Sequence, residues 1–246
     1  MRPDGRQPHE LRSLQFLRRF TDAPLGSVLS CSGRTKVLCT VTLEDTVPAF
    51  LLNTNKGWLT AEYAMLPGST GGRKPRERGG RPDARALEIG RLIGRSLRAA
   101  IDPTRFPGRT LNVDCDVLQA DGGTRTAAIN GSMVAMVDAL RVMEQRRWLR
   151  GSAADALPNH VGAMSVGLLR GDVVVDLCYE EDSRAEVDLN VVLTTDGRFV
   201  EVQGGAERGA FTQAQLDAMV GAAKGALGDV FALQQKVLAG PLPADE

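Results

Sequence analysis

Residues 110–126 read TLNVDCDVLQADGGTRT, and this stretch decides the fold. Its first nine residues alternate apolar with polar side chains, which predicts a half-buried strand. A glycine pair follows, and then a segment from Thr124 to Leu140 whose only charges are Arg125 and Asp138. A segment so poor in charge, with small and apolar residues on nearly all sides, predicts a buried central helix. We therefore place a strand, a glycine turn and a buried helix at the centre of the fold.

Working outward, the two halves of the chain show strands first and helices afterwards. The predicted elements are strands at 26–33 and 35–42, a helix from Pro82-Asp83 to about Ile101, a linker of small residues at 151–159, strands at 161–169, 173–179, 185–194 and 199–203, and a helix from Thr212 to near Gly240. This order predicts an α+β fold of two packed units, which we divide at residues 1–150 and 151–246. No clear sequence repeat relates the two units.

The overall composition is that of a globular protein, with 43% hydrophobic residues and 30 basic against 30 acidic residues. Net charge therefore indicates no partner, but the charges are unevenly distributed. Most of the charged residues at 73–98 are basic, and most of the charged residues at 176–188 are acidic. A basic and an acidic stretch are both compatible with one site that handles phosphate and metal.

The cysteines have no metal-ligand or redox spacing, so we expect them to be reduced and packed as small apolar residues. We see no signal peptide at the start, and the longest uncharged run, 156–169, is shorter than the roughly 18 apolar residues that a membrane span needs. The expected location is the cytoplasm.

The strongest local signal is the turn Gly122-Gly-Thr-Arg125. A glycine turn that opens a helix directs free backbone N–H groups and the positive end of the helix dipole at one spot, which suits an anion. A guanidinium buried at the first turn needs a counter-charge nearby. For Arg125, that charge is either a bound anion or a carboxylate of the protein.

The helix after Asp83 has an apolar side and a basic side. Arg91, Arg95 and Arg98 cluster opposite the apolar residues, facing solvent or another subunit, with Glu88 as the one plausible intrahelical partner for Arg91. Arg85 falls at the edge of the apolar arc, where we expect its head to be half buried. It either extends its charge to solvent or forms a second phosphate clamp.

An acidic cluster lies in the second unit. Asp182 precedes the strand at 185–194, whose alternation places Asp188 away from the core, so a bend would bring the two carboxylates together. Paired carboxylates hold Mg²⁺ or keep one acid protonated. A solvated turn is the alternative interpretation.

A glycine-rich loop at 68–81 carries a third group of charges, namely Arg73, Lys74, Arg76 and Arg78. Glycines and charges cannot bury themselves, so we expect a mobile loop that either grips an RNA backbone or is simply solvated. Few aromatic residues accompany it, so the loop itself does not indicate base stacking.

The order of these signals resembles the bacterial ribonuclease PH family from Arg2 to about Gly240. The matching strings are RPDGR (2–6), KGWLTAEY (56–63), EIGRLIGR (88–95), DCDVLQADGGTRT (114–126), YEED (179–182) and AEVDLN (185–190). The sequence departs from the family at Gly205, where threonine is usual, and in a loop at 68–81 that is about one residue shorter.

The resemblance implies roles for particular residues. Arg85, Gly123, Thr124 and Arg125 match phosphate-binding positions, Asp182 and Asp188 match the paired acidic residues linked to metal and catalysis, and Arg73 and Arg76 match loop arginines that contact transfer RNA. It also implies a fold of two α+β units, the first of the ribosomal protein S5 domain 2-like type, and a homohexameric ring built as a trimer of dimers.

The activity implied is phosphate-dependent 3′-to-5′ trimming of RNA, especially the 3′ ends of transfer RNA precursors, with inorganic phosphate as co-substrate and Mg²⁺ as cofactor. Two alternatives stay open. One is a metal-dependent hydrolytic nuclease, in which water replaces phosphate. The other is a non-catalytic RNA-binding subunit of a ring.

Overall fold

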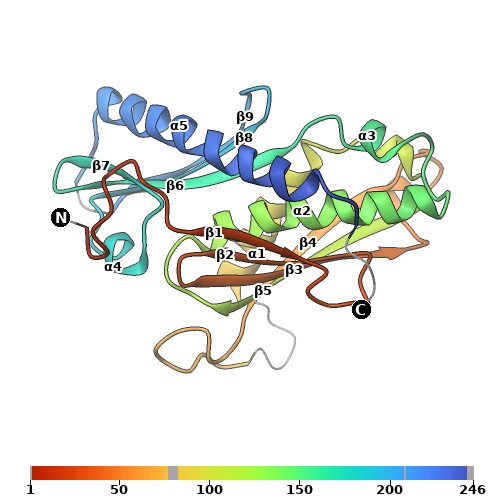
Figure 1. Cartoon of the computed structure of the whole chain (residues 1–246), viewed down its shortest axis with the longest axis horizontal. Coiled ribbons are helices and arrows are strands. Elements are labelled where there is room, and N and C mark those ends of the chain that lie inside the picture. Colours follow the sequence, from red (N-terminus) through yellow and green to blue (C-terminus); the bar gives the residue numbers. More distant parts are fainter. Residues whose placement is uncertain (1, 77–82, 208, 243–246) are drawn as a thin grey trace.

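A computed structural model describes residues 2–76, 83–207 and 209–242. Arg78 of the basic loop and Pro82 at the expected helix start lie outside these residues. The chain forms two β-sheets and two long helices that separate and cover them (Figure 1). The α+β class with two sheets is confirmed.

The first sheet has five strands in the order β1-β2-β3-β5-β4. Its strands are β1 (Leu14–Arg18), β2 (Gly26–Ser32), β3 (Thr35–Glu44), β4 (Trp58–Met65) and β5 (Thr110–Gln119). β4 runs parallel to β5, and every other pairing is antiparallel. The helix α1 (Ala84–Arg98) makes the crossover between these parallel strands and packs against β4.

The second sheet has four antiparallel strands in the order β7-β6-β8-β9. Its strands are β6 (Val161–Leu169), β7 (Asp172–Val175), β8 (Val187–Thr194) and β9 (Phe199–Ala206). The long helix α5 (Gln213–Leu238) lies along its outer side, as the upper part of Figure 1 shows. Two short helices, α3 (Ala153–Ala156) and α4 (Tyr179–Asp182), occupy the connections before β6 and β8.

The helix α2 (Thr124–Gln145) lies between the two sheets, as its composition predicts. It packs on β2 and β3 on one side and on β6 on the other. Asn130 fixes the contact with β6, since its side chain donates to the carbonyl of Ala163 at 2.9 Å and accepts from the Ala163 amide at 2.7 Å. Gly131 permits the close contact with β2, because a Cβ there would lie 2.5 Å from the side chain of Ser30. The N-terminus of α2 is thereby held at a fixed place between the sheets.

Most predicted elements are confirmed, and the differences have physical causes. The strand expected at 173–179 ends at Val175, because Asp176 takes a left-handed backbone with φ 52° and its carboxylate is bound by Arg12. The linker at 151–159 contains α3, which is started by a capping box between Ser152 and Asp155. Strands β1 and β4 were not predicted. The unit boundary near residue 150 remains a proposal.

The three arginines on the basic side of α1 were expected to face solvent or another subunit, but two of them have partners within the chain. Arg95 pairs with Glu201 on β9 at 2.7 Å. Arg98 donates to the carbonyl of Leu59 and lies over the ring of Trp58 at 4.9 Å. Both arginines therefore hold α1 against neighbouring strands of the same chain.

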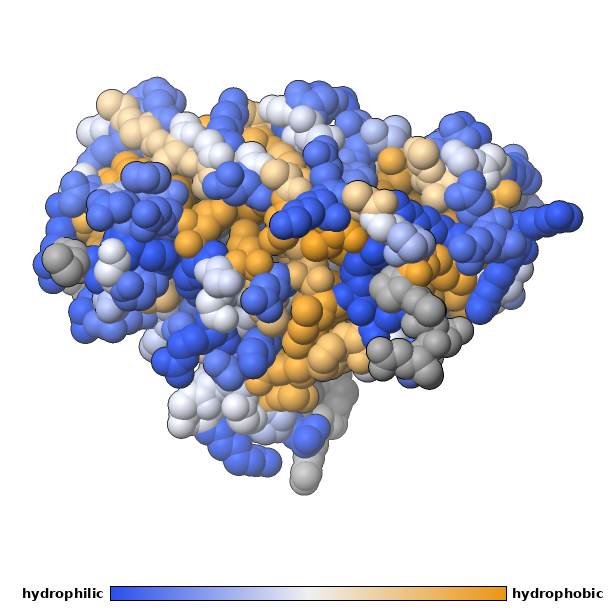
Figure 2. All heavy atoms as spheres, in the orientation of Figure 1, coloured by the Kyte–Doolittle hydropathy of each residue, from blue (hydrophilic) through white to orange (hydrophobic). Residues whose placement is uncertain are grey.

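One edge of the first sheet is exposed and partly apolar. Figure 2 shows hydrophobic side chains across the middle of the face that includes β1, below α5. Leu17 on the edge strand β1 is 47% exposed, and Phe20 just beyond it is 46% exposed. Within the described parts of the chain, no helix is long and apolar enough to cross a membrane.

Candidate active site

A cavity of about 1220 Å³ opens where the N-terminus of α2 meets α4, β8 and β9. It collects side chains from both sheets and from the loop after β4. Of the eight residues to which the resemblance assigns roles, six line this cavity, namely Arg85, Gly123, Thr124, Arg125, Asp182 and Asp188. The first four come from α1 and the α2 turn, whereas the two aspartates come from α4 and β8.

The glycine turn has the geometry of an anion site. Gly122 and Gly123 have φ values of 75° and 64°, a region that favours glycine. A Cβ at Gly122 would lie 2.5 Å from the carbonyl oxygen of Leu177, so a larger residue would push the turn away from α4. Among the residues that the structure describes, no side-chain hydrogen bond caps the start of α2, so its first amides are available to an anion.

Thr124 is held in place by a tyrosine from the neighbouring strand. The hydroxyl of Tyr63 on β4 donates to Thr124 Oγ1 at 2.9 Å, and both residues are buried. Burial raises the pKa of Tyr63, so this hydroxyl keeps its proton and remains a donor. The string KGWLTAEY contains Tyr63, but its spacing gave no sign of this contact.

Arg125 pairs with a carboxylate of the protein and also lines the cavity. Its Nη2 lies 2.7 Å from Glu88 Oε2, and Glu88 Oε1 accepts from Gln203 Nε2 at 3.0 Å. Partial burial would raise the pKa of Glu88, but the hydrogen bonds from Arg125 and Gln203 outweigh it and lower that pKa. The Nε of Arg125 has no hydrogen-bond partner among the described residues. Glu88 thus orients the guanidinium without satisfying all of its donors.

Two expectations for α1 were wrong. Glu88 partners Arg125 instead of Arg91, a contact between residues 37 positions apart. Arg85 is exposed at the first turn of α1, and not half buried at the edge of the apolar arc. The carboxylate of Asp83 caps this turn by accepting the amide of Arg85 at 3.0 Å. Arg85 therefore enters the cavity from its solvent side.

The charge of Asp182 affects the ionisation of Asp188. Burial and the nearby charge of Asp182 raise the pKa of Asp188 from 3.8 to about 6. Burial also raises the pKa of Asp182, against the opposing charges of Arg85 and Arg125. The bend expected before β8 is supplied by α4, whose last residue is Asp182.

The donor chemistry of this pair fits Mg²⁺. That ion binds to proteins through one or two carboxylates and completes its octahedral shell with water and substrate phosphate oxygens. A cation between the carboxylates would also offset the repulsion that raises the pKa of Asp188. In the described ranges, no group of three or more histidine, cysteine or acidic residues forms a metal cage.

The basic loop approaches the cavity but places its predicted RNA-contacting arginines outside. Arg73 and Arg76 are exposed and do not line the cavity, whereas Lys74 does. The start of the loop is anchored, because the amide of Ala120 donates a hydrogen bond of 2.7 Å to the carbonyl of the buried Ser69. The start of the loop is thus tied to the strand end that leads into the glycine turn.

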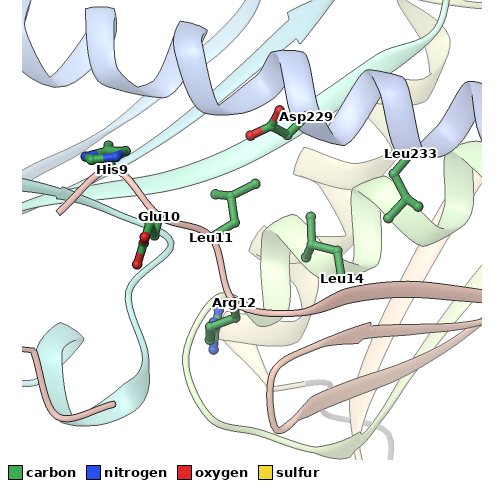
Figure 3. Close-up of a pocket in the computed structure, with 7 residues that line it drawn as sticks. All are labelled: His9, Glu10, Leu11, Arg12, Leu14, Asp229 and Leu233. Carbon is green, nitrogen blue, oxygen red and sulfur yellow. The ribbon is translucent and has the colours of Figure 1, made fainter. Parts of the chain in front are cut away.

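An N-terminal segment that sequence reasoning did not assign joins the two halves of the site. Arg12 binds the carboxylate of Asp176 at 2.6 Å and donates to the carbonyl of Asp121 at 2.6 Å, next to the glycine turn. In Figure 3, Arg12 points away from α5, whereas Leu11 and Leu14 point toward it along a hollow of about 450 Å³. The segment therefore fixes the glycine turn relative to the segment that leads into α4.

Comparison with known sequences agrees with this architecture. The sequence model described as "3′ exoribonuclease family, domain 1" matches residues 10–141, and the one for domain 2 of the same family matches residues 159–226. The chain therefore belongs to the RNase PH family of 3′ exoribonucleases.

Solved structures share the fold at low sequence identity. The Archaeoglobus fulgidus exosome with RNA bound to its active site contains a chain with a TM-score of 0.78 and 20% identity, covering 96% of this chain and 92% of that one. Rice (Oryza sativa) Rrp46 has a TM-score of 0.76 and 20% identity, with 96% of this chain and 100% of that chain covered. A chain of an archaeal exosome core has a TM-score of 0.76 and 18% identity, with 96% of this chain and 90% of that chain covered.

Proposed function

We propose that this protein is a phosphate-dependent 3′-to-5′ exoribonuclease, similar in action to bacterial ribonuclease PH. The observation that carries the proposal is the convergence of an uncapped glycine turn and two arginines with a pair of carboxylates in one cavity. The family includes exoribonucleases that use inorganic phosphate as the attacking group. A turn of free amides with Arg85 and Arg125 suits that anion.

In this mechanism the phosphate binds at the amides of Gly123 and Thr124, between Arg85 and Arg125. Its oxygen attacks the last phosphodiester of the RNA, the bond to the departing 3′-oxygen breaks, and a nucleoside diphosphate leaves. Two anions must approach each other, so the arginines neutralise charge and hold the groups in line. Glu88 keeps Arg125 oriented for this task.

Asp182 and Asp188 act on the departing oxygen. Its proton comes from one of these carboxylates, and a pKa raised to about 6 lets a minor fraction of Asp188 stay protonated at neutral pH. The same pair would hold Mg²⁺, which supplies Lewis-acid stabilisation of phosphate charge when bound. The roles of acid and metal ligand are not divided between the two residues.

The natural substrate we propose is the 3′ end of transfer RNA precursors, gripped by Arg73 and Arg76 on the exposed loop. We further propose a homohexameric ring acting in the cytoplasm. Structural neighbours belong to exosome assemblies. The exposed apolar residues Leu17 and Phe20 at the edge of the first sheet are a surface that another subunit could cover. Light scattering should give six times the chain mass, and a stable active monomer would contradict the ring.

Two other functions fit the site less well. A hydrolytic nuclease would use the carboxylates but leaves the glycine turn and both arginines without a task. A non-catalytic ring subunit does not need the phosphate residues and the acidic pair to meet in one cavity, as they do.

One experiment separates these functions. The protein is incubated with a short RNA and Mg²⁺, with and without inorganic phosphate, and the released nucleotide is identified by mass. Phosphorolysis gives nucleoside diphosphates only when phosphate is present. Nucleoside monophosphates without phosphate would indicate hydrolysis, and intact RNA under both conditions would indicate a binding subunit.

A further inference from the structure

The active-site cavity contains one exposed aromatic ring whose place in the chemistry is unassigned. Tyr179 is 65% exposed, although it lines the same cavity as the phosphate turn and the acidic pair. It is the one aromatic residue among the described residues of that lining. Exposed aromatic rings beside a charged groove are typical of single-stranded nucleic acid sites, where bases stack on them.

The position of Tyr179 relates it to the reacting groups. It is the first residue of α4, and Asp182 is three residues later, so both side chains project from the same side of one helical turn. Its amide donates to Asp121 Oδ1 at 3.4 Å, beside the glycine turn. An RNA end that reaches both the phosphate turn and Asp182 therefore passes next to this ring.

The backbone that carries the ring is rigid. Glu181, two residues along, is buried and held by Arg2 through bonds of 2.6 and 2.9 Å. A Cβ on Gly122 would lie 2.8 Å from the Tyr179 amide nitrogen, which shows how closely the turn packs against α4. A ring on a backbone that is fixed before binding needs no ordering of that backbone when a base stacks on it.

From these contacts we infer that Tyr179 is a stacking platform for a nucleobase at the 3′ end of the RNA. The inference rests on the proposed function in taking RNA as the substrate. Stacking accepts every base, because each base has a π-face, and an enzyme that removes successive nucleotides needs such tolerance. The base is that of the last nucleotide or of the one before it, and the two are distinguished by experiment.

The test compares Tyr179→Ala and Tyr179→Phe with the wild type, and uses Phe50→Ala as a control at an aromatic residue that is 66% exposed and lies outside the cavity. Binding of a short RNA is measured by fluorescence anisotropy without phosphate. The RNA is intact, or lacks the base at the last, second-last or fifth-last nucleotide. We expect Tyr179→Ala to weaken binding about tenfold, and Tyr179→Phe and Phe50→Ala to stay within about twofold.

The stacked base is identified by non-additivity. In the wild type, removing that base should weaken binding about as much as Tyr179→Ala does. In Tyr179→Ala, removing the same base should have little further effect. We expect this result for the last or the second-last nucleotide, and not for the fifth-last.

Losses that are equal for all RNAs, or equal in the Ala and Phe variants, would overturn the stacking role. A change of oligomeric mass in Tyr179→Ala without position-specific losses would instead assign the ring to a subunit contact. Because binding is measured without phosphate, position-specific stacking with no phosphorolysis would leave this inference standing while the proposed function fails. Unchanged RNA binding in Tyr179→Ala, together with normal phosphorolysis by the wild type, would overturn this inference and leave the proposed function standing.

Discussion

Arg2 and Glu181 form a bidentate ion pair across 179 positions of sequence, with Nε–Oε1 at 2.6 Å and Nη2–Oε2 at 2.9 Å. Their side chains are 4% and 1% exposed, so solvent screens neither charge. Arg2 also donates to the carbonyls of Val175 and Asp176, which closes the segment leading into α4. The position of Asp182, the next residue after Glu181, therefore depends on the second residue of the chain.

Breaking this pair should destabilise the protein strongly. Arg2→Met removes the bidentate partner of the buried Glu181 carboxylate and leaves only Arg6 Nη2, at 3.6 Å, to oppose its charge. We expect a loss of about 3 kcal/mol in the free energy of unfolding. Urea unfolding measures it. Glu180→Gln is the matched control, because Glu180 pairs with Arg184 on the exposed side of the same segment, and it should cost less than about 1 kcal/mol. Equal losses in both variants would contradict the role of burial.

Replacing Arg125 should remove phosphate handling while the fold survives. Arg125→Ala deletes a preorganised donor at the phosphate turn, so we expect phosphorolysis to fall at least ~100-fold and phosphate to bind more weakly. Phosphate titration of the reaction rate measures both effects. Arg34→Ala, at the exposed turn between β2 and β3, is the control for loss of one positive charge. Near-normal phosphate affinity in Arg125→Ala would contradict the assignment.

Asp188 should make the metal-free protein less stable as pH rises from about 4 to about 6. Its pKa is raised from 3.8 to about 6 by burial and by Asp182, so in this window the folded chain holds a proton that the unfolded chain has released. At about 1.4 kcal/mol per pKa unit, ionisation costs the folded state roughly 3 kcal/mol above pH 6. Asp188→Asn should therefore unfold at higher urea than the wild type above pH 6.

That comparison is made in EDTA at a series of pH values. The stability difference between Asp188→Asn and the wild type should shrink as pH falls from 6 to 4. Added Mg²⁺ should stabilise the wild type above pH 6 and have less effect on the variant. Parallel stability curves for the two proteins would show that Asp188 does not titrate in this range.

Local patterns in the sequence predicted what depends on neighbouring residues, and missed what depends on distant ones. The alternation of β5, the glycine turn and the charge-poor α2 are local, and the structure contains all three. The pairing of Glu88 with Arg125 and of Arg95 with Glu201 joins residues far apart, so helical spacing could not reveal either. The same reason explains why the basic side of α1 was misread.

The end of β7 illustrates the same limit. Residues 173–179 look like a continuing strand, but the carboxylate of Asp176 binds Arg12, which is 164 positions earlier in the sequence. The chain turns there and forms α4, which carries Tyr179 and Asp182 into the cavity. Local patterns therefore did not predict the short helix α4, which carries part of the candidate site. They did single out Asp182, which lies on it.

The exposed loop should matter for structured RNA and not for the chemistry. Arg73 and Arg76 are exposed and lie outside the lining of the cavity, so we expect them to contribute electrostatic contact with an RNA backbone beyond the cleaved end. Arg73→Ala with Arg76→Ala should weaken binding of transfer RNA precursors more than that of short oligonucleotides. The slope of log affinity against log salt should fall by about 1–2, because each phosphate that an arginine no longer neutralises lowers it by roughly one unit.

Filter binding at several salt concentrations measures this slope, and initial rates on a short single strand should change less than about twofold. The control is Arg34→Ala with Arg170→Ala, which removes the same charge from two exposed turns, β2–β3 and β6–β7. If the control flattens the salt dependence equally, net charge and not the loop accounts for the effect. An equal loss on both RNA classes in the loop variant would place these arginines in the active site or at a subunit contact.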